Sequence, residues 1–116
     1  MWTGQLFQKM KQLPRPPCIK KGVDKMTLVI TDNRVKDREE YLPLAKAFAE
    51  DGRKEKGCHE MTVCADPEVK DRVVFISKWD SKEDFLAHVQ GPAFAKHIPG
   101  MGSYYVSGTD TFLELV

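Results

Sequence analysis

Four stretches of the chain carry apolar side chains in the pattern that is typical of β-strands. They are rich in β-branched and aromatic residues and are bounded by glycine, proline or polar turn residues. We expect strands over residues 26–35, 58–65, 72–79 and 104–116. An interior glycine usually marks a bulge or bend, so we expect an interruption of the last strand at Gly108. The short polar link between the second and third strands predicts an antiparallel hairpin.

The first of two predicted helices covers residues 39–56. Tyr41, Ala45 and Phe48 recur at steps of three and four residues, which places them on one buried face. Gly57 is the expected end of this helix, because glycine commonly follows the last helical turn.

The second predicted helix begins after Ser81, whose hydroxyl is a candidate cap for the first turn. Phe85 lies on its buried face, and Gly91 followed by proline ends it. We expect residues 93–97 to add one more helical turn before Pro99.

The predicted order is β-α-β-β-α-β, which is that of the ferredoxin-like α+β fold. Such a four-stranded sheet carries helices on one face only. The strands are nearly continuous apolar runs at residues 28–30, 73–76 and 112–116, and strands of this kind bury both faces. One chain cannot supply the second cover. We therefore expect a homodimer in which the two sheets pack face to face.

Length and charge fit a single small globular domain. The chain has 116 residues and a formal net charge of +1, which argues against a nucleic-acid-binding surface. We expect residues 1–25 to be a basic arm or linker and residues 26–116 to be the domain. No apolar run is long enough to cross a membrane. The three cysteines lack metal-site spacing, and reduced thiols predict a cytoplasmic protein.

His88 and Trp79 are the first candidates for chemistry. His88 shares a helical face with Phe85, where a neutral imidazole could hold a substrate hydroxyl or accept its proton. A half-buried histidine that bonds a backbone carbonyl is an equally open interpretation. Trp79 closes the third strand, and such a residue serves core or interface packing more often than it forms a pocket wall.

Asn33, His97 and one of two tyrosines are further candidates. Asn33 ends the first strand, where asparagine more often serves a turn, although its amide could also stabilise an anionic oxygen. His97 is either an exposed side chain or part of a pocket roof. Either Tyr104 or Tyr105 faces inward, and the sequence does not say which. The three histidines lack ligand spacing, so we predict no metal site.

Four short motifs in this chain occur together, in order, in one family of small proteins. They are Glu55-Lys56-Gly57-Cys58, then Phe75-Ile76-Ser77-Lys78-Trp79, then Asp80-Ser81 followed by Phe85 and His88, and finally Gly91-Pro92-Ala93-Phe94. In this spacing they resemble the antibiotic-biosynthesis-monooxygenase (ABM) family over about residues 26–116. The resemblance implies a homodimer whose two sheets join into a barrel.

The resemblance also implies a pocket and a set of activities. His88 and Trp79 would border the pocket, with Asn33, Phe94 and His97 as further lining. Some family members oxidise quinols or polyketide phenols with molecular oxygen and without metal or flavin, whereas others degrade haem or isomerise a signalling sugar.

Two positions depart from the family pattern. Lys78 stands where the family often has an acidic residue, which alters the charge beside the tryptophan. His88 stands where haem-degrading members carry a second tryptophan, so a haem-degrading mechanism loses support.

We therefore expect a cofactor-independent monooxygenase that oxidises a quinol or phenolic small molecule. His88 and Asn33 are its expected catalytic residues, and the substrate would contact Trp79, Phe85, Phe94, His97 and Tyr104. Two alternatives stay open. One is a non-catalytic dimer that binds a small molecule, and the other is a haem protein with His97 as the iron ligand.

Overall fold

The computed structural model describes residues 26–116. The predicted arm of residues 1–25 lies outside the described residues. The elements are β1 (Thr27–Val35), α2 (Arg38–Gly52), β2 (Cys58–Ala65), β3 (Arg72–Trp79), α3 (Lys82–His88), α4 (Pro92–Met101), a 3₁₀ turn (Gly102–Tyr104) and β4 (Tyr105–Glu114). This arrangement confirms the ferredoxin-like α+β prediction, with one more helix than expected.

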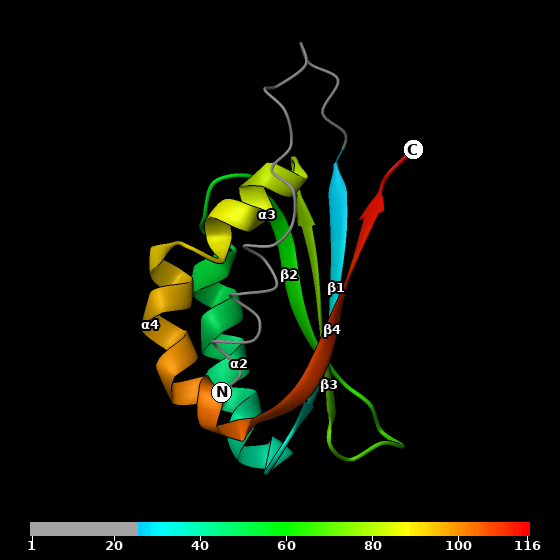
Figure 1. Cartoon of the computed structure of the whole chain (residues 1–116), viewed down its shortest axis with the longest axis vertical. Coiled ribbons are helices and arrows are strands. Elements are labelled where there is room, and N and C mark those ends of the chain that lie inside the picture. Colours follow the sequence, from blue (N-terminus) through cyan, green and yellow to red (C-terminus); the bar gives the residue numbers. More distant parts are fainter. Residues whose placement is uncertain (1–25) are drawn as a thin grey trace.

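The four strands form one antiparallel sheet in the order β2-β3-β1-β4. Within the described residues, α2, α3 and α4 all lie on one face of this sheet, and the other face carries no helix (Figure 1). The core lies between the helices and the sheet, where Trp79, Tyr41 and Ile98 are almost completely buried. None of the described helices is long and apolar enough to span a bilayer.

The predicted single turn after Gly91 is wrong, because α4 is a full helix of 10 residues. It continues through Pro99, which we expected to lie beyond the helical turn. Phe94, Ile98 and Met101 are all buried along one side of α4, and this burial outweighs the backbone hydrogen bond that proline cannot make.

The predicted interruption of the last strand at Gly108 is also wrong. β4 is continuous, and Gly108 pairs with Asn33 of β1; the irregularity lies two positions away, opposite Arg34 and Val35. A Cβ atom added to Gly108 would overlap Oδ1 of Asn33. The glycine therefore makes room for a buried side chain of the neighbouring strand, which is the other common reason for glycine inside a strand.

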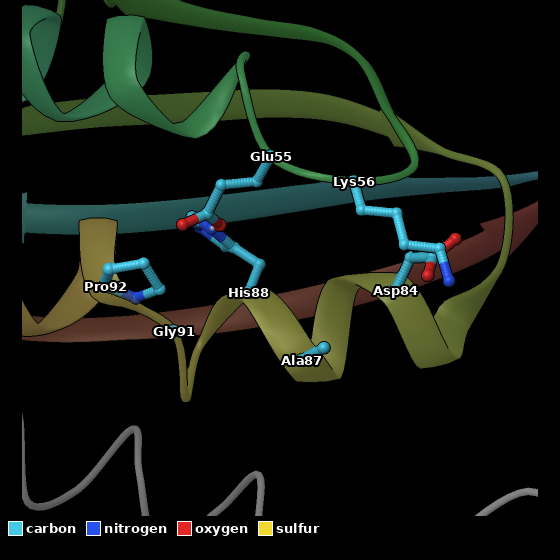
Figure 2. Close-up of a pocket in the computed structure, with 7 residues that line it drawn as sticks. All are labelled: Glu55, Lys56, Asp84, Ala87, His88, Gly91 and Pro92. Carbon is cyan, nitrogen blue, oxygen red and sulfur yellow. Dashed lines mark hydrogen bonds and ion pairs between the residues drawn. The ribbon is translucent and has the colours of Figure 1, made fainter.

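The first long helix ends earlier than predicted, at Gly52 instead of Lys56. A tight turn follows, in which Glu55 N donates to Gly52 O and Cys58 N donates to Glu55 O. Gly57 lies in this turn with φ of +83°, a conformation that favours glycine. The early end places Glu55 on the turn beside α3 (Figure 2).

Candidate functional site

The side chain of His88 is buried in a cluster of aromatic rings where α3 ends. Only 3% of this side chain is exposed. Its ring centroid lies 5.0 Å from that of Trp79, 5.4 Å from Phe48, 5.9 Å from Phe85 and 6.3 Å from Phe94. These neighbours come from β3, α2, α3 and α4, so the histidine lies where the sheet and all three helices meet.

Glu55 is the polar partner of this histidine. Its Oε1 lies 2.6 Å from Nδ1 of His88, and its Oε2 accepts a hydrogen bond from the backbone N–H of Ala93 at 3.2 Å. Figure 2 shows the Glu55 and His88 side chains meeting end to end between the turn after α2 and helix α3.

Burial governs the protonation of the imidazole. It lowers the pKa of His88 below the ordinary value of 6.5, and the nearby Glu55 carboxylate offsets only part of this effect. His88 is therefore neutral at pH 7, so one of its ring nitrogens has a free lone pair. A neutral histidine in an apolar site can act as a general base.

A pocket of about 300 Å³ lies beside the Glu55–His88 pair. It is lined by Glu55, Lys56, Asp84, Ala87, His88, Gly91 and Pro92 (Figure 2). This volume lies at the lower end of the range for small-molecule sites.

A second carboxylate–histidine pair joins α2 to α4. Nε2 of His97 lies 2.6 Å from Oδ2 of Asp51, and the His97 ring packs against Phe48 with centroids 5.9 Å apart. The hydrogen bond from His97 lowers the pKa of Asp51. Phe48 thus separates the two histidines, because it contacts the rings of both His88 and His97.

Asn33 lies at the opposite end of the sheet from Trp79. It pairs with Val73, six residues along β3 from Trp79, which corresponds to roughly 20 Å at about 3.3 Å per residue. Asn33 is 1% exposed, and among the described residues its Nδ2 has no hydrogen-bond partner. Burial raises the pKa of Tyr41, and the neighbouring Asn33 side chain opposes that effect.

Tyr104 also belongs to this distant end. Its ring lies 6.1 Å from that of Tyr41, and its hydroxyl donates to Glu40 at 3.1 Å. The structure therefore brings together four of the predicted residues, which are His88, Trp79, Phe85 and Phe94. It places His97 one ring away, behind Phe48, and separates Asn33 and Tyr104 from the group.

The sequence interpretation gave no role to Glu55 or Phe48 in the site. Phe48 carried a detectable signal, since its spacing on α2 marks it as buried. Glu55 was part of a family motif but had no predicted partner, because His88 lies 33 residues away and no local spacing rule connects the two.

The histidines and acidic residues do not gather around a common point. Within residues 26–116, no group of three or more histidine, cysteine, aspartate or glutamate side chains could hold a metal ion. The hydrogen bond to Asp51 also occupies Nε2 of His97, which is the nitrogen that an iron ligand would commonly use.

The four-stranded antiparallel sheet with helices on one face defines a small α+β protein of the ferredoxin-like class. The family profile described as antibiotic biosynthesis monooxygenase matches residues 27–100, more than half of the chain. The chain belongs to the antibiotic biosynthesis monooxygenase family. Membership in this family supports a monooxygenase.

Solved structures share this fold at low sequence identity. SnoaB, a cofactor-independent oxygenase from Streptomyces nogalater, is 15% identical with a TM-score of 0.68, covering 81% of this chain and 95% of that chain. A conserved protein from Bacteroides thetaiotaomicron, described as a possible oxidoreductase, is 20% identical with a TM-score of 0.72. The match covers 80% of this chain and 100% of that chain. A conserved protein from Methanosarcina mazei is 19% identical with a TM-score of 0.70, and the match covers 78% of this chain and 92% of that chain.

At these identities the likeness extends to the fold alone. None of the curated proteins compared with the chain matches it.

Proposed function

We propose that this protein is a cofactor-independent monooxygenase that oxidises a phenol or quinol with molecular oxygen. Family membership supports the reaction class. One observation about the site carries the proposal: the buried His88 imidazole is held by Glu55 among aromatic rings and borders a pocket of about 300 Å³. A neutral imidazole beside the pocket is a group that could accept the proton of a phenol.

The proposed reaction begins with transfer of the phenol proton to His88. The electron-rich phenolate then gives one electron to oxygen, and the resulting superoxide and phenoxyl radical combine at a ring carbon to form a peroxide anion. The O–O bond breaks as the ring C–H proton passes to the departing oxygen, which yields the quinone and hydroxide. The proton held by His88 then converts the hydroxide to water. Phenol and oxygen thus give quinone and water, with the substrate oxidised and oxygen reduced by four electrons.

The position of Asn33 sets a condition on its proposed catalytic role. An amide that donates to a developing anion must lie within hydrogen-bond reach of it. Because Asn33 lies roughly 20 Å along the sheet from Trp79, it could serve only a substrate that extends from one end of the core to the other. On a single-ring phenol, the proton transfer depends on His88 alone.

We also propose that the protein acts as a homodimer through the helix-free face of the sheet. Leu28, Ile30, Val74 and Ile76 lie on that face and are only partly buried in one chain, and Leu113 beside them is 45% exposed. An apolar patch of this kind marks an interaction surface. A second copy would supply the missing cover to both chains at once.

Light scattering on an Ile76→Glu variant tests the dimer. Ile76 pairs with Ile30 in the middle of the face, so a buried charge there should give monomers at concentrations where the native protein is dimeric. Ala47→Glu, on the exposed side of α2, is the matched control and should remain dimeric. A native protein that is monomeric at micromolar concentration would contradict the proposal.

Oxygen consumption across a panel of phenols and quinols tests the activity. His88→Gln should lower the rate by about 100-fold or more, which is the usual contribution of a general base. His59→Gln removes an exposed histidine of β2 and should leave the rate unchanged. Equal rates for native protein and His88→Gln would refute the assigned role of His88.

Two further measurements would identify the alternatives, which are the non-catalytic binding module and the haem protein. A molecule that copurifies with the protein, together with no oxygen consumption above the protein-free control, would identify a binding module. A Soret shift on haem titration, lost in His97→Ala, would identify the haem-binding alternative.

A further inference from the structure

Glu55 holds two groups at once from the turn after α2. Its two carboxylate oxygens bind different partners, Nδ1 of His88 at 2.6 Å and the backbone N–H of Ala93 at 3.2 Å. Ala93 lies in the first turn of α4, whose first backbone N–H groups have no partner inside the helix. One side chain therefore links the imidazole to the start of a helix.

The sequence at the start of α4 leaves room for this carboxylate. Gly91 occupies the N-cap position and has no side chain with which to cap the helix. A Cβ atom added to Gly91 would lie 3.4 Å from Oε2 of Glu55 and 3.2 Å from the carbonyl oxygen of Ala87. Glu55 takes over the capping role, and the helix N-terminus in turn favours the negative charge.

The two hydrogen bonds determine which nitrogen of His88 carries the proton. An ionised carboxylate only accepts hydrogen bonds, so Nδ1 of His88 must be the donor. In the neutral imidazole the lone pair then lies on Nε2. Because Oε2 is fixed by Ala93, the carboxylate also fixes the orientation of the ring.

We propose that Glu55 is a positioning residue that holds His88 in the Nδ1–H tautomer, with Nε2 ready to accept the substrate proton. This inference rests on the proposed function for its use in catalysis, whereas the tautomer itself can be observed without any substrate.

Glu55→Gln separates this role from simple packing. The glutamine has the same shape but only one acceptor oxygen, and the N–H of Ala93 still requires an acceptor. When the amide oxygen serves Ala93, the amide NH₂ faces Nδ1 and stabilises the opposite Nε2–H tautomer. The lone pair then points at the glutamine and is lost as a base.

Side-chain ¹⁵N–¹H correlation spectra of the full chain at pH 7.5 measure the tautomer directly. The native protein should show a protonated Nδ1 and an unprotonated Nε2 for His88. Glu55→Gln should shift the population toward Nε2–H and, with an active substrate, lower kcat by about 100-fold or more with a smaller change in KM. Asp51→Asn makes the same change in the second carboxylate–histidine pair and should leave the His88 signals as they are.

The outcomes distinguish this inference from the proposed function. A native His88 with its proton on Nε2 would overturn the inference, as would a folded Glu55→Gln variant with an unchanged tautomer, even if its activity fell. The predicted tautomers in native protein and variant, with no oxygen consumption by the native protein, would uphold the positioning role and refute the monooxygenase.

Discussion

The burial of His88 makes the stability of the fold depend on pH. The direction of this dependence follows from the lowered pKa of the buried imidazole. Burial lowers the pKa of His88 in the folded state below the ordinary 6.5, whereas the unfolded chain titrates near that ordinary value. Between the two values the unfolded state binds more protons, so stability rises with pH. The contribution is fully present above pH 6.5 and is lost as the pH falls toward the lowered folded-state pKa.

The size of the effect is set by one proton. Between pH 7.5 and pH 5.5 the unfolded chain takes up at most one proton at this histidine, so its protonation can lower the free energy of unfolding by at most about 1.4 kcal/mol. That is a measurable part of the roughly 5–15 kcal/mol that stabilises a small domain. Asp32, Asp51 and Asp66 also have lowered pKa values in the folded state, but their contributions are lost only near and below 3.8.

Urea unfolding followed by tryptophan fluorescence at pH 5.5, 6.5 and 7.5 measures this slope. His88→Gln should lower stability at every pH but remove the part of the slope that His88 causes. His59→Gln, at an exposed position, should keep that part. The reasoning is refuted if His88→Gln has the same pH slope as the native protein, or if the native protein gains stability from pH 7.5 to pH 5.5.

Three substitutions test the packing that supports the site. Phe48→Ala removes the ring between the two histidines and should cost about 3–5 kcal/mol in urea unfolding; a loss below about 1 kcal/mol would show that the ring is not a core contact. Gly108→Ala should lower the free energy of unfolding by about 1–3 kcal/mol, because the added methyl group overlaps Asn33. In a double-mutant cycle with Asn33→Ala, the double variant should lose less stability than the sum of the two single variants. Strictly additive losses would count against the overlap. Ser81→Ala removes the cap that accepts from Asp84 N at 3.2 Å and should cost about 1 kcal/mol; an unchanged urea midpoint would contradict it.

Much of the fold could be predicted from the sequence, because alternation and turn residues are local signals. β2 and β3 begin and end at the predicted residues, since their apolar runs are separated by a short polar link. Ser81 caps α3 as its position indicated. The errors came where packing outweighed a local rule. α4 continues through Pro99 because its apolar face is buried, and Gly108 marks a close side-chain approach instead of an interruption.

Only part of the site could be predicted in the same way. Phe85 and His88 are three residues apart on one helix, so their common face follows from helical spacing. The Glu55–His88 pair could not be predicted, because it depends on where α2 ends and on how the following turn meets α3. The separation of Asn33 from Trp79 depends on the antiparallel pairing of β1 with β3, which is a long-range contact that no local spacing rule describes.

The most direct test of the central claim is oxidation of an accepted phenol under ¹⁸O₂, with mass spectrometry of the product. A monooxygenase that uses His88 as its base should place one labelled oxygen atom in the quinone and the other in water, and His88→Gln should make about 100-fold less labelled quinone. A quinone without label, or equal labelled product from native protein and His88→Gln, would contradict the account.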